Sequence, residues 1–421
     1  MAYRLFRLDN GLTVILHQDR KVPVVSVNMW YHVGSANEKP GRTGFAHLFE
    51  HLMFEGSKHV KEGQFDKWLE AAGGNNNGST DNDRTNYYED VPSNALELAL
   101  FLESDRMGYL LDPLSPATVD GQRDVVKNER RQSYDNQPYG LASIELDKML
   151  YPPTHPYSWP TIGNMEDLTA ATYQDVVDFF KTYYVPNNAS LVVAGDIDLD
   201  NAEQLVRKWF SEIPRGAPVA PIAPPMPTLT DVKRKTLTDK VQLSRLFIAW
   251  LSPKQFAPDD ATLDVAASIL AGGKNSRLYK RLVYDTRMAQ DVSAYQGGTT
   301  LAGSFQLIAT ARPGKSVADI QKVVDEEVDR LKREPPEAHE VQRAVNGIEA
   351  SFYRAMERVG SYRGKAEQLN AYYTATGEPD YFARDLARYK AVTPADVQAA
   401  IARWLPADRR VELVVEPEAK P

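Results

Sequence analysis

The hydrophobic and polar positions of the chain alternate between patterns typical of strands and of amphipathic helices. Residues 24–33 form a nearly continuous apolar run, which predicts a largely buried strand. Residues 44–55 carry apolar side chains at helical spacing and end near Gly56, so they predict a helix. Residues 73–80 are rich in Gly and Asn, which predicts a turn-rich approach to a short strand over 86–88. Two further helices are predicted, over 94–108 and 116–133.

The two halves of the chain repeat one plan. Residues 171–195 predict a helix that begins with a Thr N-cap and an acid three residues later, followed by a Pro and an apolar strand. Residues 392–415 show the same features in the same order. The strand and helix expected at 241–251 and 259–271 also match the first half. We therefore expect an internal duplication of α+β units. The alternative is two unrelated α/β domains with similar helix–strand endings.

The middle of the chain separates these halves. Residues 213–228 contain six prolines and have neither a helical nor a strand period. Such a composition predicts a semi-rigid, extended linker. We expect an N-terminal domain over 1–212 and a homologous C-terminal domain over 229–421.

Composition narrows the classes of protein. The chain has 421 residues, a net charge of −8 and no cysteine. The acidic balance argues against a nucleic-acid partner, and the lack of cysteine excludes thiolate ligands and thiol nucleophiles. No apolar run is long enough to predict a membrane span, and the first residues lack a signal-peptide core. We expect a cytoplasmic protein, or a periplasmic one if a signal was removed from the chain.

The most informative chemistry lies in the helix expected at 44–55. His47 and His51 are four residues apart, so both imidazoles project from one face of a helix and can bind the same metal ion. Glu50 lies on nearly the same face, beside any water that such a metal would hold. This combination indicates metal-assisted hydrolysis. The alternative is a helix whose histidines are hydrogen-bonded or exposed, although the apolar neighbours indicate a buried helix, in which unpartnered imidazoles are costly.

Two histidines leave a hydrolytic zinc site one protein ligand short. Without cysteine, the third ligand is expected to be Asp, Glu or another His. Glu129 is the best candidate, because it shares one stripe of the helix expected at 116–133 with Val119, Gln122 and Val126. Periodicity alone, however, favours the alternative that Glu129 is a solvated acid on a charged helix.

The order His-x-x-Glu-His inverts the common zinc-protease motif. With it, the chain resembles the pitrilysin-type (inverzincin) zinc metallopeptidases, the family of insulin-degrading enzyme and mitochondrial processing peptidase. The resemblance extends over essentially the whole chain, and the matching segments are Leu8–Leu12, Gly44–Gly56, Thr85–Tyr88, Arg123–Glu129 and His155–Tyr157.

The resemblance implies an α+β fold of two homologous α/β-roll domains, of the split-barrel or duplicated ferredoxin-like kind, forming half of a clam shell. It also implies one Zn²⁺ per chain, bound by His47, His51 and Glu129, with Glu50 as general base in an endopeptidase or oligopeptidase acting on unfolded peptides.

Family members bind substrate as an added strand on a sheet edge. The resemblance assigns this role to Asn77, Gly78, Ser79 and Thr80, and the alternative is an ordinary turn. Family members also carry a supporting glutamate seven residues before the third ligand. Here that position is Gln122, which can donate hydrogen bonds but adds no charge.

A second departure concerns the second half of the chain. Family members place an Arg and, seven residues later, a Tyr where they contact the substrate, and the matching positions here are Val283 and Gln290. Both functional groups are missing. The resemblance to the two-chain processing peptidase therefore predicts a heterodimer in which a homologous subunit supplies the Arg/Tyr pair. A homodimer, or a monomer with substitute residues, is the alternative.

Two other classes of function compete with the peptidase interpretation. One is a non-catalytic core or assembly subunit, against which the retention of His47, Glu50, His51 and Glu129 argues. The other is a peptide-binding protein with a structural zinc, which would normally have a fourth His or Cys ligand.

Overall fold

The structure is a computed structural model that describes residues 1–418. The chain divides into two compact units. Unit 1 comprises residues 1–130, 159–222 and 352–383, and unit 2 comprises the remaining described residues. The boundary at residues 222 and 223 falls inside the predicted linker. Against the predicted domains 1–212 and 229–421, however, residues 131–158 and 352–383 group with the unit built mainly from the other half of the sequence.

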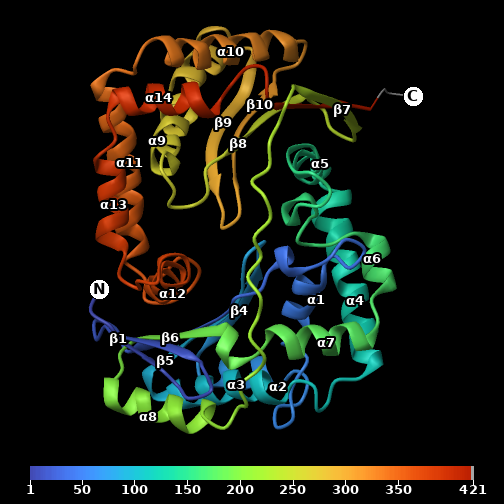
Figure 1. Ribbon diagram of the computed structural model, residues 1–421, viewed down its shortest axis with the longest axis vertical. Helices are drawn as coiled ribbons and strands as arrows, with labels where there is room; N and C mark the ends of the chain where they lie inside the picture. Colours follow the sequence, from blue (N-terminus) through green and yellow to red (C-terminus); the bar gives the residue numbers. More distant parts are fainter. Residues whose placement is uncertain (419–421) are drawn as a thin grey trace. The chain divides into compact units, whose positions relative to one another are not determined.

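Unit 1 is built on a six-stranded mixed sheet in the order β1-β2-β6-β3-β5-β4 (Figure 1). The strands are β1 (Arg4–Arg7), β2 (Thr13–Gln18), β3 (Val24–Tyr31), β4 (Asn75–Thr80), β5 (Thr85–Pro92) and β6 (Ala189–Gly195). Strand β3, predicted from its apolar run, is buried in the sheet between β6 and β5. Strand β4 pairs with β5 alone among the named strands, so it is an edge strand.

The helices of unit 1 pack around this sheet. They are α1 (Phe45–Leu52), α2 (Gln64–Ala71), α3 (Leu96–Tyr109), α4 (Pro116–Arg130), α6 (Met165–Ala170), α7 (Tyr173–Tyr183), α8 (Leu199–Phe210) and α12 (Lys365–Thr376). Helix α1 contacts α4 and the β4–β5 end of the sheet, and α1 and α4 lie side by side in Figure 1.

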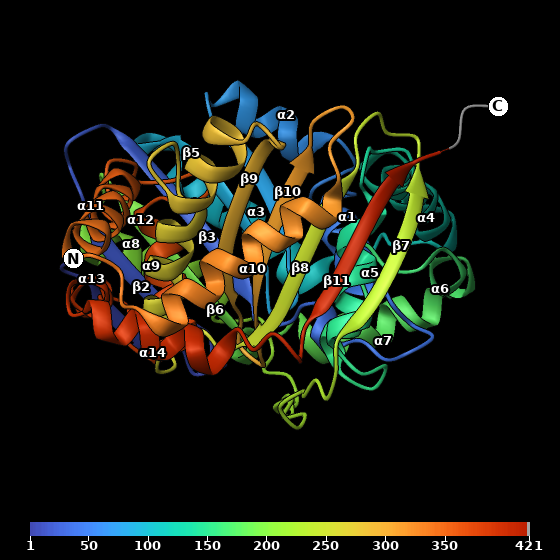
Figure 2. The ribbon, with the colours of Figure 1, turned by 90° about the horizontal axis from the view of Figure 1, so that it is seen from above.

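Unit 2 contains a five-stranded sheet in the order β7-β11-β8-β10-β9 (Figure 2). Its strands are β7 (Lys233–Asp239), β8 (Arg245–Ser252), β9 (Ala289–Gly298), β10 (Gly303–Ala311) and β11 (Val411–Pro417). The helices are α5 (Leu141–Leu150), α9 (Asp260–Ala271), α10 (Val317–Arg333), most of α11 (Ala338–Ala355), most of α13 (Phe382–Lys390) and α14 (Pro394–Trp404); the last residues of α11 and the first of α13 belong to unit 1. Side chains of α9, α10 and α14 form one hydrophobic core with the sheet.

The two sheets share one topology, as an internal duplication predicts. Strands β2-β6-β3-β5-β4 and β7-β11-β8-β10-β9 have the same order and the same relative directions, with one parallel pair followed by antiparallel pairs. Thr172 and Thr393 cap α7 and α14 with the same capping box. The predicted α+β class is therefore confirmed, whereas the split-barrel and clam-shell descriptions stay predictions.

One helix in each unit comes from the other half of the sequence. Helix α12 packs on the unit 1 sheet, where Ala366 and Leu369 join the core formed by Ile15, Val192 and Ala194. Helix α5 packs against β8 and β11 of unit 2. Among residues 1–418, no helix combines the length and the apolar character needed to cross a bilayer.

Candidate metal centre

Helix α1 carries the predicted ligands because its apolar face is fixed in the core. Phe45, Leu48, Phe49 and Leu52 are buried, as the sequence pattern predicts. The side chains of His47, Glu50 and His51 come from the remaining surface of the helix and are only partly exposed.

A buried acid holds the start of α1. Gly44 precedes the helix and has no side chain to cap it, but Glu38 accepts hydrogen bonds from the backbone N–H groups of Gly44 and Ala46 at 3.0 and 2.8 Å. Burial raises the pKa of Glu38 to about 8, although these hydrogen bonds oppose the shift. Helix spacing gave no sign of this contact, since Glu38 lies outside the helix that it caps.

Three ligand atoms converge as a metal site requires. His47, His51 and Glu129 each contribute one ligand atom, and these three atoms all lie within 4.8 Å of one another. Glu129 Oε2 is 3.1 Å from His51 Nε2 and 3.7 Å from His47 Nε2. Ligand atoms bound tetrahedrally to one zinc ion at 2.0–2.1 Å are about 3.3–3.4 Å apart. The observed separations lie on either side of this value, so the donor set fits a zinc ion.

The electrostatics of these groups suit metal binding. Burial lowers the pKa of His47 to about 4, so its imidazole is neutral at pH 7. The hydrogen bond to His51 lowers the pKa of Glu129, so this carboxyl is ionised. Neutral imidazoles and an ionised carboxylate are the forms that bind a metal.

Glu50 faces the edge strand β4. The hydroxyl of Thr80 donates a 2.6 Å hydrogen bond to Glu50 Oε2. A Cβ atom on Gly78 would lie 3.1 Å from Glu50 Cγ, so this strand passes close to the carboxyl. Burial raises the pKa of Glu50 above its usual range, and the bond from Thr80 opposes that shift.

Helix α4 places the two predicted residues differently. Val119 and Val126 are buried, which confirms the inward stripe, and Glu129 at its end reaches the histidines. Gln122 instead donates a 2.6 Å hydrogen bond to Glu55. The carboxyl of Glu55 also interacts electrostatically with His51, and the sequence pattern did not predict that this acid lies near the site.

The segment assigned to substrate binding is a strand. Asn77, Gly78, Ser79 and Thr80 belong to β4, so the alternative of an ordinary turn is wrong. The turn-like composition is outweighed by pairing with β5, in which Asn77 lies opposite Tyr88. Strand β5 is also longer than the predicted 86–88.

The two positions that match the family's Arg and Tyr, Val283 and Gln290, both lie in unit 2. Val283 lies in a π-helical segment (Tyr279–Asp285) and packs against the unit 2 core. Gln290 is exposed near the start of β9. Both positions therefore lack the expected functional groups, and Val283 has a packing role.

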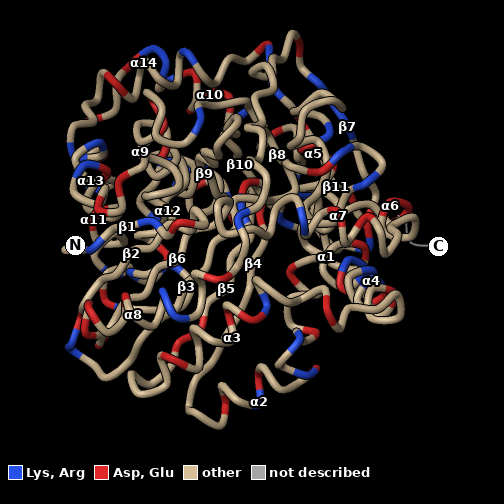
Figure 3. Tube along the Cα trace, turned by 60° about the horizontal axis from the view of Figure 1, so that its bottom comes forward, with Lys and Arg blue, Asp and Glu red and all other residues tan. Residues whose placement is uncertain are grey.

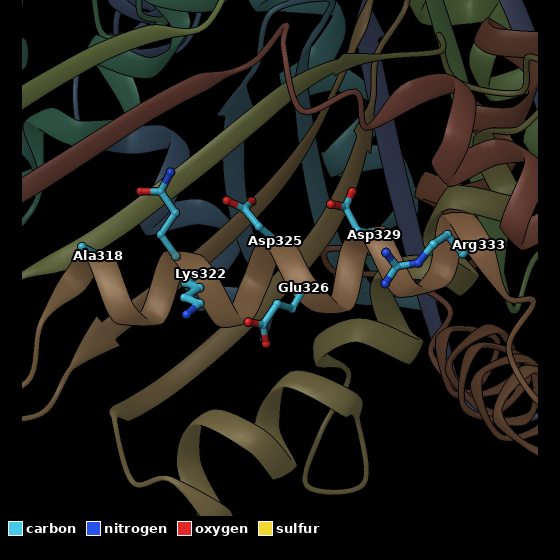
Figure 4. A pocket seen from close by; sticks show the side chains of 7 residues that line it. Ala318, Lys322, Asp325, Glu326, Asp329 and Arg333 are labelled. Atoms are coloured by element: carbon cyan, nitrogen blue, oxygen red, sulfur yellow. The ribbon is translucent and has the colours of Figure 1, made fainter.

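The structure also has a hollow along α10, which is lined by acidic and basic side chains (Figure 4). Its lining is polar, but Asp325 is paired with Arg410 and Glu326 with Arg281. Charges of both signs are interspersed along the chain (Figure 3). The carboxylates at α10 are thus satisfied by the protein itself.

Comparison with known proteins places this geometry in a family. The family described as "Insulinase (Peptidase family M16)" matches residues 13–148, and "Peptidase M16 inactive domain" matches residues 170–348. The "Zinc protease PqqE" of Helicobacter pylori is 30% identical over 85% of this chain and 81% of its own length. The chain belongs to peptidase family M16.

Further members show how far the likeness extends. A crystal structure of a protease from Helicobacter pylori matches with a TM-score of 0.91 and 27% identity, over 99% of both chains. Human insulin-degrading enzyme is 32% identical over 50% of this chain but only 21% of its own length. The fold of the Helicobacter pylori protease therefore matches 99% of this chain, whereas most of insulin-degrading enzyme lies outside the matched part.

Proposed function

We propose that this M16 member is a zinc-dependent endopeptidase or oligopeptidase that hydrolyses unfolded peptides. One observation carries the proposal: the side chains of His47, His51 and Glu129 converge at zinc-like separations, with Glu50 on the same helix. The names of the relatives, which are zinc proteases, support the same metal.

Metal binding and proton transfer are assigned to different residues of the chain. His47, His51 and Glu129 would hold one zinc ion, which when bound supplies acidity to a water and polarises the scissile carbonyl. Glu50 accepts the proton of the attacking water and delivers it to the leaving amine. Its raised pKa suits both halves of this role, since the protonated form must be accessible near neutral pH.

The edge strand β4 supplies the peptide-binding element. Its outer edge can pair with the backbone of an extended peptide, and Gly78 and Thr80 bring that peptide beside Glu50. Backbone pairing demands little of the peptide sequence but requires an unfolded segment. Hence we propose flexible peptides as substrates.

A homologous subunit is proposed as the partner. The absence of Arg and Tyr at Val283 and Gln290 leaves this chain without two groups that would stabilise the transition state. A second M16 chain bearing that pair would complete the site. A homodimer stays the alternative.

Cleavage of an internally quenched peptide tests the function. We expect hydrolysis by the chain mixed with an Arg/Tyr-bearing M16 partner, loss of at least about 1000-fold in kcat in Glu50→Gln, and unchanged zinc content in that variant. Loss after chelation and recovery with zinc would support the metal. Peptide binding without cleavage in every mixture would instead favour a binding protein with structural zinc, and neither binding nor cleavage would favour an assembly subunit.

A further inference from the structure

The segment before α12 lies against the edge region of the unit 1 sheet. The hydroxyl of Ser361 donates a 2.8 Å hydrogen bond to Asp90 of β5. Gly360 is packed so tightly there that a Cβ atom would fall 1.7 Å from Asp90 Oδ1. These contacts fix residues 360–363 on the face of the sheet that α12 covers.

Tyr362 lies above the pair of residues nearest the edge. Asn77 of β4 and Tyr88 of β5 are directly opposite each other. The phenol oxygen of Tyr88 is hydrogen-bonded by the side chain of Asn77 and by the backbone of Tyr362. The phenol of Tyr88 therefore connects the backbone of Tyr362 to Asn77 of the edge strand.

The side chain of Tyr362 remains open to solvent. It is 55% exposed, and both neighbours, Ser361 and Arg363, have positive φ angles of 62° and 66°. Non-glycine residues in this region are strained, and such strain often accompanies a functional constraint. Two contacts hold the strained turn: Ser361 donates to Asp90, and the Arg363 N–H donates to Glu367. Neither contact involves the ring of Tyr362.

A peptide added to β4 would present alternate side chains to two faces. Those on the face of Gly78 and Thr80 point toward Glu50 and α1, whereas those on the face of Asn77 point toward Tyr362. Directly opposed side chains on neighbouring strands are about 4.5–5.5 Å apart at Cβ, within reach of an aromatic ring.

We infer that Tyr362 is a specificity-determining residue that favours an aromatic peptide side chain paired beside Asn77. The inference rests on the proposed function only in requiring that a peptide binds along β4. Aromatic pairs prefer offset or edge-to-face contacts, which an exposed, backbone-anchored ring can offer. The guanidinium of Arg363 lies 5.9 Å from the centroid of the Tyr362 ring and also interacts electrostatically with Glu367, so an acidic peptide side chain is the competing occupant that the test must exclude.

Binding to the Glu50→Gln chain, mixed with its partner if cleavage requires one, tests this inference without turnover. The probe is a fluorescent polar peptide in which one phenylalanine is moved a position at a time, with alanine and glutamate versions. We expect phenylalanine to tighten binding about five- to tenfold at alternate positions only. Adding Tyr362→Ala should reduce this preference to about twofold or less, Tyr362→Phe should retain it, and Tyr353→Ala, a similarly exposed tyrosine, should not change it.

The outcomes separate the two proposals. An unchanged phenylalanine preference in Tyr362→Ala would overturn the inference, and so would a glutamate preference that disappears in Arg363→Ala. If the aromatic preference depends on Tyr362 but the chain with Glu50 cleaves none of these peptides in any mixture, the inference stands and the peptidase proposal fails. If cleavage occurs without any preference at alternate positions, the peptidase proposal stands and the inference fails.

Discussion

At the scale of single residues, Glu50 is governed by two opposing effects. Burial raises its pKa, and the hydroxyl of Thr80 lowers it. A general base works in its ionised form, so activity falls as the pH drops through this pKa. Replacing Thr80 with Val removes the lowering effect, and we expect the acid limb of the kcat/KM profile to move up by about half to one pH unit. Thr80→Ser should restore the original limb, and an unmoved limb in Thr80→Val would contradict this role.

Glu129 and Gln122 allow a matched comparison on one helix. Glu129→Gln removes an ionised ligand, so we expect zinc affinity to fall by more than about 100-fold, since even residues behind the ligands change it 10–100-fold. Gln122→Ala removes only a hydrogen bond to Glu55 and should cost about tenfold or less. Competition with a chromogenic chelator measures both. Equal losses in the two variants would show that Glu129 is not a ligand.

Residue spacing revealed only part of the site. His47, Glu50 and His51 lie within one helical turn, so periodicity alone brings them together. Glu129 needed the family resemblance, because its place on the inward stripe of a charged helix does not by itself separate a metal ligand from a solvated acid. Glu38 and Glu55 were missed, since their partners are reached through loops and between helices rather than along one element.

At the scale of elements, α1 depends on Glu38 for its first turn. In Glu38→Gln one of the two accepting oxygens becomes an amide nitrogen, which cannot accept a hydrogen bond from Gly44 or Ala46. A buried backbone N–H without a partner costs about 1–3 kcal/mol, so we expect that loss in the free energy of unfolding of the zinc-free chain. Urea unfolding measures it. Glu97→Gln, at an exposed ion pair with Lys208, should change stability by less than about 1 kcal/mol.

The elements show where local patterns suffice. The strand at 24–33 and the helix at 44–55 were predicted because burial and periodicity coincide in them. Residues 73–80 were predicted as turn-rich, yet residues 75–80 form β4, since pairing with β5 is a tertiary effect that Gly and Asn composition does not reveal. Helix α4 ends at Arg130, where a π-helical segment begins, earlier than the predicted residue 133.

At the scale of the whole molecule, the Pro-rich linker contains one boundary between the units, but it does not predict which segments belong to each unit. Helix α12 joins unit 1 through Asn370, whose amide donates to Asn28 and to the Ser190 backbone. A buried polar contact between residues so far apart in sequence has no local signal. The likeness of the two halves was visible in the sequence because the repeated caps and strands are local features, whereas the grouping of α5 with unit 2 and of α12 with unit 1 is not.

The missing Arg/Tyr pair makes a prediction about assembly. If a homologous subunit supplies these groups, titrating it into a fixed amount of this chain should raise kcat until the two are equimolar, by about 100-fold or more. A partner whose own Arg and Tyr are changed to Ala and Phe should still bind but give no rise. Gln290→Tyr, at an exposed position, should not replace the partner, since the other matching position is still Val283, which packs against the core and supplies no guanidinium. Full activity of the chain alone, at concentrations where it is monomeric by sedimentation, would contradict the heterodimer.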